Sequence, residues 1–149
     1  MPSLEDLITL LQQHGLKITP QRRLILELLA QDAGHPSAED IYQRVAAAMP
    51  TVSRATVYNT LHELVALGAL SEVQDLSENR LRYDTHTGIH HHLFCTRCHT
   101  LVDIHHDFEA LHLAPEEAAG YQILKHQVTF YGLCPQCQQQ EAAEKKQAL

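Results

Sequence analysis

No apolar run in this chain is long enough to span a bilayer, and no charged-then-apolar leader opens it, so we expect a cytosolic protein. Basic residues are also scarce. Lys and Arg number 11 against 18 Asp and Glu, and the formal charge of −7 supplies no global basic field for DNA or a membrane. There are only four cysteines, arranged in two C-x-x-C pairs. In a reducing compartment such pairs favour metal binding over disulfides.

Histidine, by contrast, is abundant and unevenly placed. Nine of the 12 histidines follow residue 85, which marks a boundary near residue 84. The 149 residues are enough for one ordinary domain or two small ones. A domain of roughly 60–80 residues is marginal alone and often needs a metal or a partner subunit.

The first half of the chain predicts short helices followed by a hairpin. Capping residues precede apolar residues at helical spacing. The four expected helices begin after Ser3, Thr19, Ser37 and Ser53. Gly15 and Gly68 are expected to terminate the first and the fourth, and strands are expected over 69–74 and 80–83. This is the layout of a winged helix-turn-helix; the alternative is a helical domain with a hairpin and no nucleic-acid role.

The fourth helix carries polar residues suited to reading base edges in a DNA groove. Its outward residues are expected to be Ser53, Arg54, Thr56, Tyr58, Asn59 and His62, of which His62 is expected to be a plain surface histidine. Lys17, Arg22 and Arg23 near the second helix, and Arg80 and Arg82 on the hairpin, suit phosphates. Acidic neighbours such as Glu39 nearly cancel this positive charge. Binding should therefore depend on where the charges lie.

The second half predicts strands over 91–95, 100–104 and 122–131, and a helical stretch over 107–119 interrupted or restarted at Pro115. The polar tail after Cys137 is expected to be a frayed helix or disordered.

The two C-x-x-C pairs predict a structural zinc site. Two intervening residues let both thiolates of a pair face one ion, and two such pairs make a closed tetrahedron. The predicted ligands are Cys95, Cys98, Cys134 and Cys137. Three other interpretations fit the sequence less well. Residues 95–99 match the c-type haem attachment motif, but that attachment normally requires export. The second pair could be a redox pair, but it does not open a helix in a βαβ unit. A zinc deaminase would need an H-x-E motif, which is missing here.

A second donor set consists of nitrogen and oxygen. His90 and His92 alternate on a strand and share a face, which Asp103 on the paired strand can approach, and Asp84 lies six residues before His90. Such a set suits ferrous iron or manganese as well as zinc. The alternative is a solvated His-rich turn.

With these motifs, the sequence resembles the ferric uptake regulator family of metal-dependent repressors. The resemblance rests on residues 15–22 (GLKITPQR), 35–42 (HPSAEDIY), 53–61 (SRATVYNTL), 90–95 (HHHLFC) with Cys98, and 131–137 (YGLCPQC). It implies an α+β protein. A winged helix-turn-helix (1–83) and a hinge (84–89) would precede a small α/β dimerisation domain with a polar tail (90–149). It also implies a structural zinc, a regulatory metal, and a homodimer on a palindromic DNA operator.

Carried over residue by residue, the family's regulatory site falls on His35, Asp84, His90, His92 and Asp103. Uptake regulators of this family usually have Glu where Asp84 and Asp103 stand. Aspartate at both positions looks more like the peroxide-sensing repressors, in which ferrous iron promotes oxidation of a ligand histidine and DNA is released. Manganese-uptake repressors share much of the outline, so control by manganese or iron level is the alternative.

Some members carry a further metal site. Here His91, Glu109 and His126 fall near its positions, but Ile89 replaces an expected histidine.

Two other function classes fit the sequence less well. An enzyme would need an open metal position and a substrate pocket, whereas five protein ligands leave little room and no candidate nucleophile is evident. Zinc storage would leave the Tyr58/Asn59 helix without a purpose, so we predict a repressor and no enzyme.

Overall fold

The computed structural model describes residues 2–32, 34–75, 78–106, 108 and 111–147. The chain forms two compact units, Met1–Thr87 and Gly88–Leu149, and each is described by itself. Among the described residues, no helix combines the length and the apolar composition needed to cross a bilayer.

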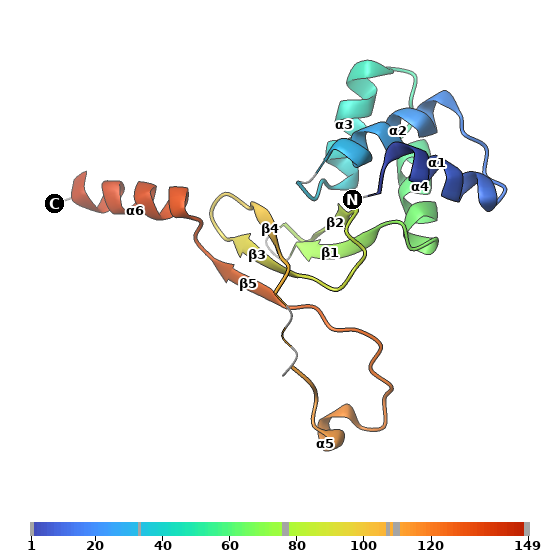
Figure 1. Cartoon of the computed structure of the whole chain (residues 1–149). Coiled ribbons are helices and arrows are strands. Elements are labelled where there is room, and N and C mark those ends of the chain that lie inside the picture. Colours follow the sequence, from blue (N-terminus) through green and yellow to red (C-terminus); the bar gives the residue numbers. More distant parts are fainter. Residues whose placement is uncertain (1, 33, 76–77, 107, 109–110, 148–149) are drawn as a thin grey trace. The chain divides into compact units, whose positions relative to one another are not determined.

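Four helices build the described part of the first unit (Figure 1). Each begins directly after its predicted capping residue. They are α1 (Leu4–Gln13), α2 (Pro20–Gln31), α3 (Ala38–Ala48) and α4 (Arg54–Ala66). Each cap's hydroxyl accepts a hydrogen bond from the backbone N–H three residues further on; the caps are Ser3, Thr19, Ser37 and Ser53. A cap of this kind satisfies an otherwise orphaned N–H of the first turn and contributes about 1 kcal/mol.

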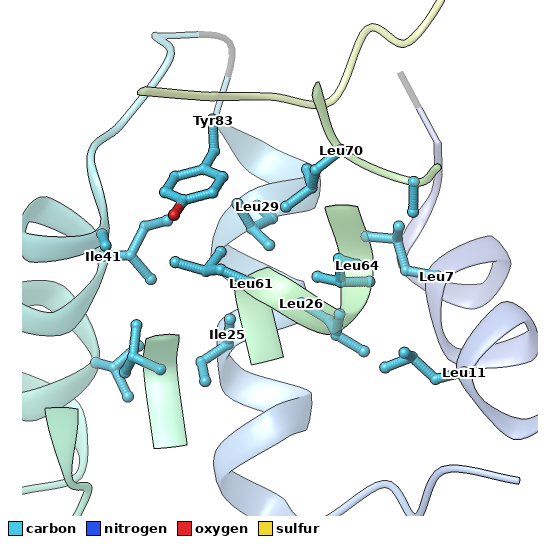
Figure 2. Packing of buried hydrophobic residues seen from close by; sticks show 14 of the residues in the cluster. Leu7, Leu11, Ile25, Leu26, Leu29, Ile41, Leu61, Leu64, Leu70 and Tyr83 are labelled. Carbon is cyan, nitrogen blue, oxygen red and sulfur yellow. The ribbon is translucent and has the colours of Figure 1, made fainter. Parts of the chain in front are cut away.

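The apolar faces of these helices meet in one core (Figure 2). It includes Leu7, Leu11, Ile25, Leu26, Leu29, Ile41, Leu61, Leu64, Leu70 and Tyr83. Leu61 and Leu64 of α4 are fully buried there. Because residues three or four apart share one helical face, this burial turns the opposite, polar face of α4 toward solvent.

A two-stranded hairpin completes the first unit. β1 (Ser71–Asp75) and β2 (Arg80–Asp84) pair antiparallel, with Ser71 opposite Asp84, and lie within two residues of the predicted strands. The N–H of Tyr83 donates to the Pro36 carbonyl at 2.9 Å, which fastens β2 to the loop before α3. Helices followed by this hairpin form the winged helix-turn-helix expected from the sequence.

A buried ion pair joins the two strands of this hairpin, and its arginine also contacts the loop before α3. Arg82 donates through Nε and Nη2 to Oδ2 of Asp75, both at 2.8 Å, and the two side chains are only 9% and 0% exposed. Arg82 Nη1 also donates to the carbonyl oxygen of His35 at 3.5 Å. One guanidinium thus joins β2, the end of β1 and the His35 loop.

The second unit is organised around β3 (His91–Cys95). This strand is central in a three-stranded sheet of order β4-β3-β5 (Figure 1). β4 (Leu101–Ile104) pairs with it antiparallel and β5 (Thr129–Gly132) pairs with it parallel. The helix α6 (Pro135–Gln147) follows β5, so the tail that the sequence left open is helical.

Two predictions for this unit were wrong in part. The strand expected over 122–131 is limited to β5: it pairs parallel to β3 from His92↔Thr129 onward, so earlier residues lie beyond the start of β3. The helix expected over 107–119 is reduced to α5 (Pro115–Ala118), and residues 107, 109 and 110 lie outside the described residues. Pro115 disfavours helix in the residue before it, and Ala119 with φ of 47° ends the turn.

We expect Arg82→Gln to destabilise the first unit by about 3–5 kcal/mol, because it leaves the Asp75 carboxylate buried without its main cation. Arg23→Gln is the matched control. It removes the same side chain from an exposed pair with Glu27, which is expected to contribute roughly 0–1 kcal/mol. Urea unfolding followed by far-UV circular dichroism compares the two free energies. Equal effects would contradict a structural role for the buried pair.

Candidate metal centres and nucleic-acid interface

Four cysteine side chains converge in the second unit. Cys95 ends β3 and Cys98 lies in the turn after it, whereas Cys134 precedes α6 and Cys137 lies in its first turn. One Sγ from each lies within 4.8 Å of the others, and Sγ of Cys98 and Sγ of Cys134 are 3.7 Å apart. Tetrahedral zinc with Zn–S bonds of ~2.3 Å needs S···S separations of about 3.8 Å. The donor type and spacing therefore fit zinc.

The electrostatics of the cluster also favour a cation. Hydrogen bonds from the backbone N–H groups of Cys98 and Cys134 lower the pKa of the Cys95 thiol to about 5. Burial and the neighbouring sulfurs raise the pKa of the Cys137 thiol to about 12. The Cys95 sulfur is thus favoured as a thiolate, whereas ionisation of Cys137 beside it is disfavoured until positive charge is added. A divalent cation supplies that charge.

Both cysteines of each pair contribute to this cluster, so neither pair stands apart as a haem-attachment or redox motif. The second pair does lie at the start of a helix, α6. No described strand follows α6, however, so the βαβ context of a redox pair is not formed.

Histidine and aspartate donors gather on the opposite end of β3. His92 lies opposite Asp103 of β4 in the strand register, and His90 is two residues earlier. The Nε2 atoms of His90 and His92 are 3.1 Å apart, and Oδ1 of Asp103 lies 3.8 Å and 3.6 Å from them. Metal–nitrogen bonds of ~2.1 Å at right angles place two nitrogens about 3.0 Å apart. These three residues fit part of one coordination sphere.

The orientation of His90 supports this interpretation. Its Nδ1 lies 2.8 Å from the carbonyl oxygen of Gly88, which can only accept a hydrogen bond. Nδ1 therefore carries the proton, and Nε2 directs its lone pair at His92 and Asp103. A carbonyl that sets the tautomer in this way is a common feature of metal-bound histidine.

The first unit carries a second, smaller set. Nε2 of His35 lies 3.5 Å from Oδ2 of Asp84, and both side chains are buried. His35 adopts a left-handed backbone conformation, with φ of 52°, in the loop held by Arg82 and β2. Oδ1 of Asp84 accepts the N–H of His86 at 2.6 Å, which fixes the carboxylate. A strained residue held by several contacts is typical of functional positions.

The outer face of α4 has the predicted composition. Tyr58 is 47% exposed, Arg54 and Asn59 are exposed, and Thr56 is half-buried. Lys17 is exposed in the loop before α2. These side chains are accessible to a DNA groove.

Arg22 is more constrained than its sequence position suggested. Its Nη2 donates to both carboxylate oxygens of Glu63 on α4, at 2.8 Å and 2.6 Å. Its Nη1 donates to the carbonyl of Lys17 at 3.1 Å. Arg22 thus connects the start of α2 with α4, and its DNA contact stays a prediction. The sequence did not indicate a role for Glu63, because it lies 41 residues from Arg22 and such a separation leaves no local signal.

Comparison with known proteins identifies the chain. The family model "Ferric uptake regulator family" matches residues 13–131. The chain belongs to this family. It is 35% identical to the "Peroxide-responsive repressor PerR" of Staphylococcus saprophyticus over 136 residues, which cover 91% of each protein.

Solved structures agree with the family assignment. The structure of PerR from Streptococcus pyogenes is 31% identical, covers 92% of this chain and 94% of its own, and has a TM-score of 0.54. A "zinc-bound manganese uptake regulator" is 25% identical, covers 86% of this chain and 98% of its own, and has a TM-score of 0.65. Membership of the family confirms the predicted fold class and the predicted function class, a metal-dependent transcriptional repressor.

The third metal site seen in some family members stays a prediction. Glu109 lies outside the described residues. The rings of His91 and His126 stack at 5.7 Å, and Nδ1 of His91 accepts the N–H of Val128 at 3.1 Å. A neutral His91 that accepts there carries its proton on Nε2, so a metal would compete with this hydrogen bond or proton.

We expect Cys134→Ser to abolish zinc binding and to unfold the second unit, since structural zinc in small domains contributes on the order of 10 kcal/mol. His99→Asn is the control. It removes the histidine of the haem-like motif, and Asn tolerates the left-handed φ of 61° at this position. Zinc content by mass spectrometry under native conditions and oligomeric state by light scattering report the outcome. A folded, dimeric Cys134→Ser protein without zinc would refute the structural role.

Proposed function

We propose that this protein is a homodimeric repressor that binds DNA when its regulatory metal site is filled and releases it on reaction with peroxide. It would act in the cytoplasm and not as an enzyme. The observation that carries the proposal is the chemistry of the two aspartates. Asp84 lies beside His35 in the first unit, and Asp103 lies beside His90 and His92 in the second. Relatives named for peroxide response support the same interpretation.

One ion is proposed to bind both donor sets. His35 and Asp84 offer two donors and the second unit offers three, whereas iron and manganese ordinarily take more than either set alone. Shared ligation favours whichever arrangement of the units brings all five together. The ion therefore acts as a switch only because other arrangements lack part of the set.

The histidines are proposed to be the point of oxidation. Ferrous iron, when bound, would promote cleavage of the O–O bond of peroxide by relaying electrons, and the imidazole would be the net two-electron reductant. In the net exchange one imidazole C–H bond of a ligand histidine is replaced by C–O, and one molecule of water is released. The oxidised ring is a poorer donor, so the shared site is lost and with it the DNA-binding arrangement.

DNA is proposed to be read by the exposed residues of α4. Tyr58 and Asn59 would contact base edges, with Arg54, Thr56, Lys17 and Arg22 in support. Two copies related by a two-fold axis would read a palindromic operator, with half-sites roughly one helical turn apart or overlapping.

The dimer is proposed to use one face of the sheet in the second unit. Leu93 of β3 lies opposite Val102 of β4 and beside Phe130 of β5 in the register, so the three share a face. Their exposed fractions are 50%, 50% and 43%. Apolar side chains clustered like this are typical of a protein–protein interface.

A repressor that responds only to metal level is the alternative function. The solved manganese uptake regulator has a TM-score of 0.65 with this chain, against 0.54 for the solved PerR, and iron or manganese would occupy the same donors. The two functions differ in whether the ligand histidines are oxidised.

Peroxide treatment of the iron-loaded protein is expected to add one oxygen atom to His35 or His90 and to release DNA. The manganese-loaded protein should stay unmodified and bound, because manganese at this site does not react in the same way. Peptide mass spectrometry and a gel shift measure the two results. The exposed His112 is an internal control and should not be modified.

Asp103→Glu should reduce this oxidation by changing the ligand geometry at His90 and His92. Iron-loaded protein that keeps unmodified His35 and His90 and still holds DNA would favour the metal-uptake alternative.

Tyr58→Ala is expected to weaken binding to an operator selected from random duplexes by about 1–3 kcal/mol, because a base contact is lost. His62→Ala removes another exposed side chain from the same helix and should have little effect. Fluorescence anisotropy measures both affinities in the manganese-loaded dimer, whose metal content should not change. Unchanged operator affinity in Tyr58→Ala would place DNA recognition on another element.

A further inference from the structure

The DNA-binding unit neutralises its own arginines. Residues 1–87 contain seven Lys and Arg side chains against eleven Asp and Glu. Each of its six arginines pairs with a carboxylate of the same unit. The pairs are Arg22–Glu63, Arg23–Glu27, Arg44–Asp32, Arg54–Glu39, Arg80–Glu78 and Arg82–Asp75. Since affinity for any DNA sequence comes largely from phosphate neutralisation, such pairing lowers the non-specific part of binding.

Arg54 is the arginine best placed to meet DNA. It is the first residue of α4, and its side chain is 55% exposed. Its guanidinium lies over the ring of Tyr42 at 4.2 Å and forms an ion pair with Glu39, both on α3. The two α3 side chains therefore hold the Arg54 guanidinium at the start of α4.

Glu39 is itself held in place. Its Oε1 accepts a hydrogen bond from Nε2 of Gln43 at 2.6 Å, and its Oε2 pairs with Arg54. These hydrogen bonds lower the pKa of the Glu39 carboxyl, so it is ionised at neutral pH. The Glu39 side chain is 42% exposed, so both members of the ion pair are accessible to solvent. A phosphate that approaches Arg54 must displace this carboxylate or lie beside it.

We propose that Glu39 lowers the affinity of the first unit for DNA of any sequence by competing with DNA phosphates for Arg54. The inference rests on the proposed reading of DNA by α4. A phosphate on the same guanidinium would lie well within the Debye length of about 8 Å from the Glu39 charge at physiological salt, so the two anions repel. The competition lowers affinity for every sequence equally. Stable occupancy then requires the base contacts of α4 in both half-sites of the metal-loaded dimer.

The alternative is that Glu39 and Tyr42 hold Arg54 in its DNA-binding pose. The two interpretations predict opposite changes in DNA affinity for Glu39→Gln: tighter binding if Glu39 competes with phosphates, and weaker binding if it holds Arg54 in place. This substitution replaces the carboxylate by an uncharged amide and keeps a side chain of the same size beside Gln43 and Arg54. Because Glu39 is exposed, the substitution is expected to leave the fold intact, and far-UV circular dichroism checks this.

The experiment measures binding of full-length, manganese-loaded protein to a random-sequence 30-base-pair duplex between about 50 and 200 mM salt. Glu39→Gln is expected to bind about five- to thirtyfold more tightly, as one or both protomers gain a phosphate contact. The slope of log K against log salt should steepen by about 0.9 for each arginine released. Arg54→Gln in the Glu39→Gln background should remove both gains.

Glu5→Gln is the matched control. It makes the same change in net charge on the exposed first turn of α1, where Glu5 makes no ion pair with the described residues. It should leave affinity and slope unchanged. Weaker or equal binding by Glu39→Gln, or an equal gain from Glu5→Gln, would overturn the inference. If Tyr58→Ala still loses operator affinity in that case, the proposed function stands and only the role of Glu39 fails.

Discussion

Four sulfur donors can lie within a few ångströms of one another as thiolates only where a cation offsets their repulsion and the cost of burying them. The second unit depends on that interaction. Among its described residues, the large apolar side chains that are buried are Phe94 and Leu101, whereas the first unit has a core built from all four helices. The cysteines join the end of β3, the turn after it and the start of α6. Bound zinc therefore supplies cohesion that apolar burial does not.

The first unit depends instead on the contacts between β2 and the loop that contains His35. Three successive residues of β2 reach this loop: Arg82 through its guanidinium, Tyr83 through its N–H and Asp84 through its carboxylate. A metal bound by His35 and Asp84 would act directly on the strand that forms the hairpin. Regulation would thus need no long chain of side chains within this unit, because Asp84 lies on β2 of the hairpin and His35 lies in the loop that β2 contacts.

The acidic charge of the protein is consistent with a DNA-binding role once the positions of the charges are known. Arg82 contributes to the architecture, and its buried pairing with Asp75 leaves little of its charge for phosphates. Exposed Tyr58 and Asn59 remain for base contacts. A repressor of this kind would rely on direct reading and on two-fold symmetry more than on a general attraction to DNA.

Local patterns in the sequence determined the helices, the hairpin, β3 and the four-cysteine set, because caps, apolar periodicity and C-x-x-C spacing act over a few residues. His35 could be added only through resemblance to a family, since nothing near it in the sequence marks a metal ligand. Tertiary structure decided the rest. The predicted strand over 122–131 became the short β5, which starts at Thr129 opposite His92, because a parallel strand has no pairing partner before β3 begins. The partners of Arg22, Arg54 and Arg82 likewise emerged only from packing, because ion pairs between distant residues leave no periodic signal along the chain.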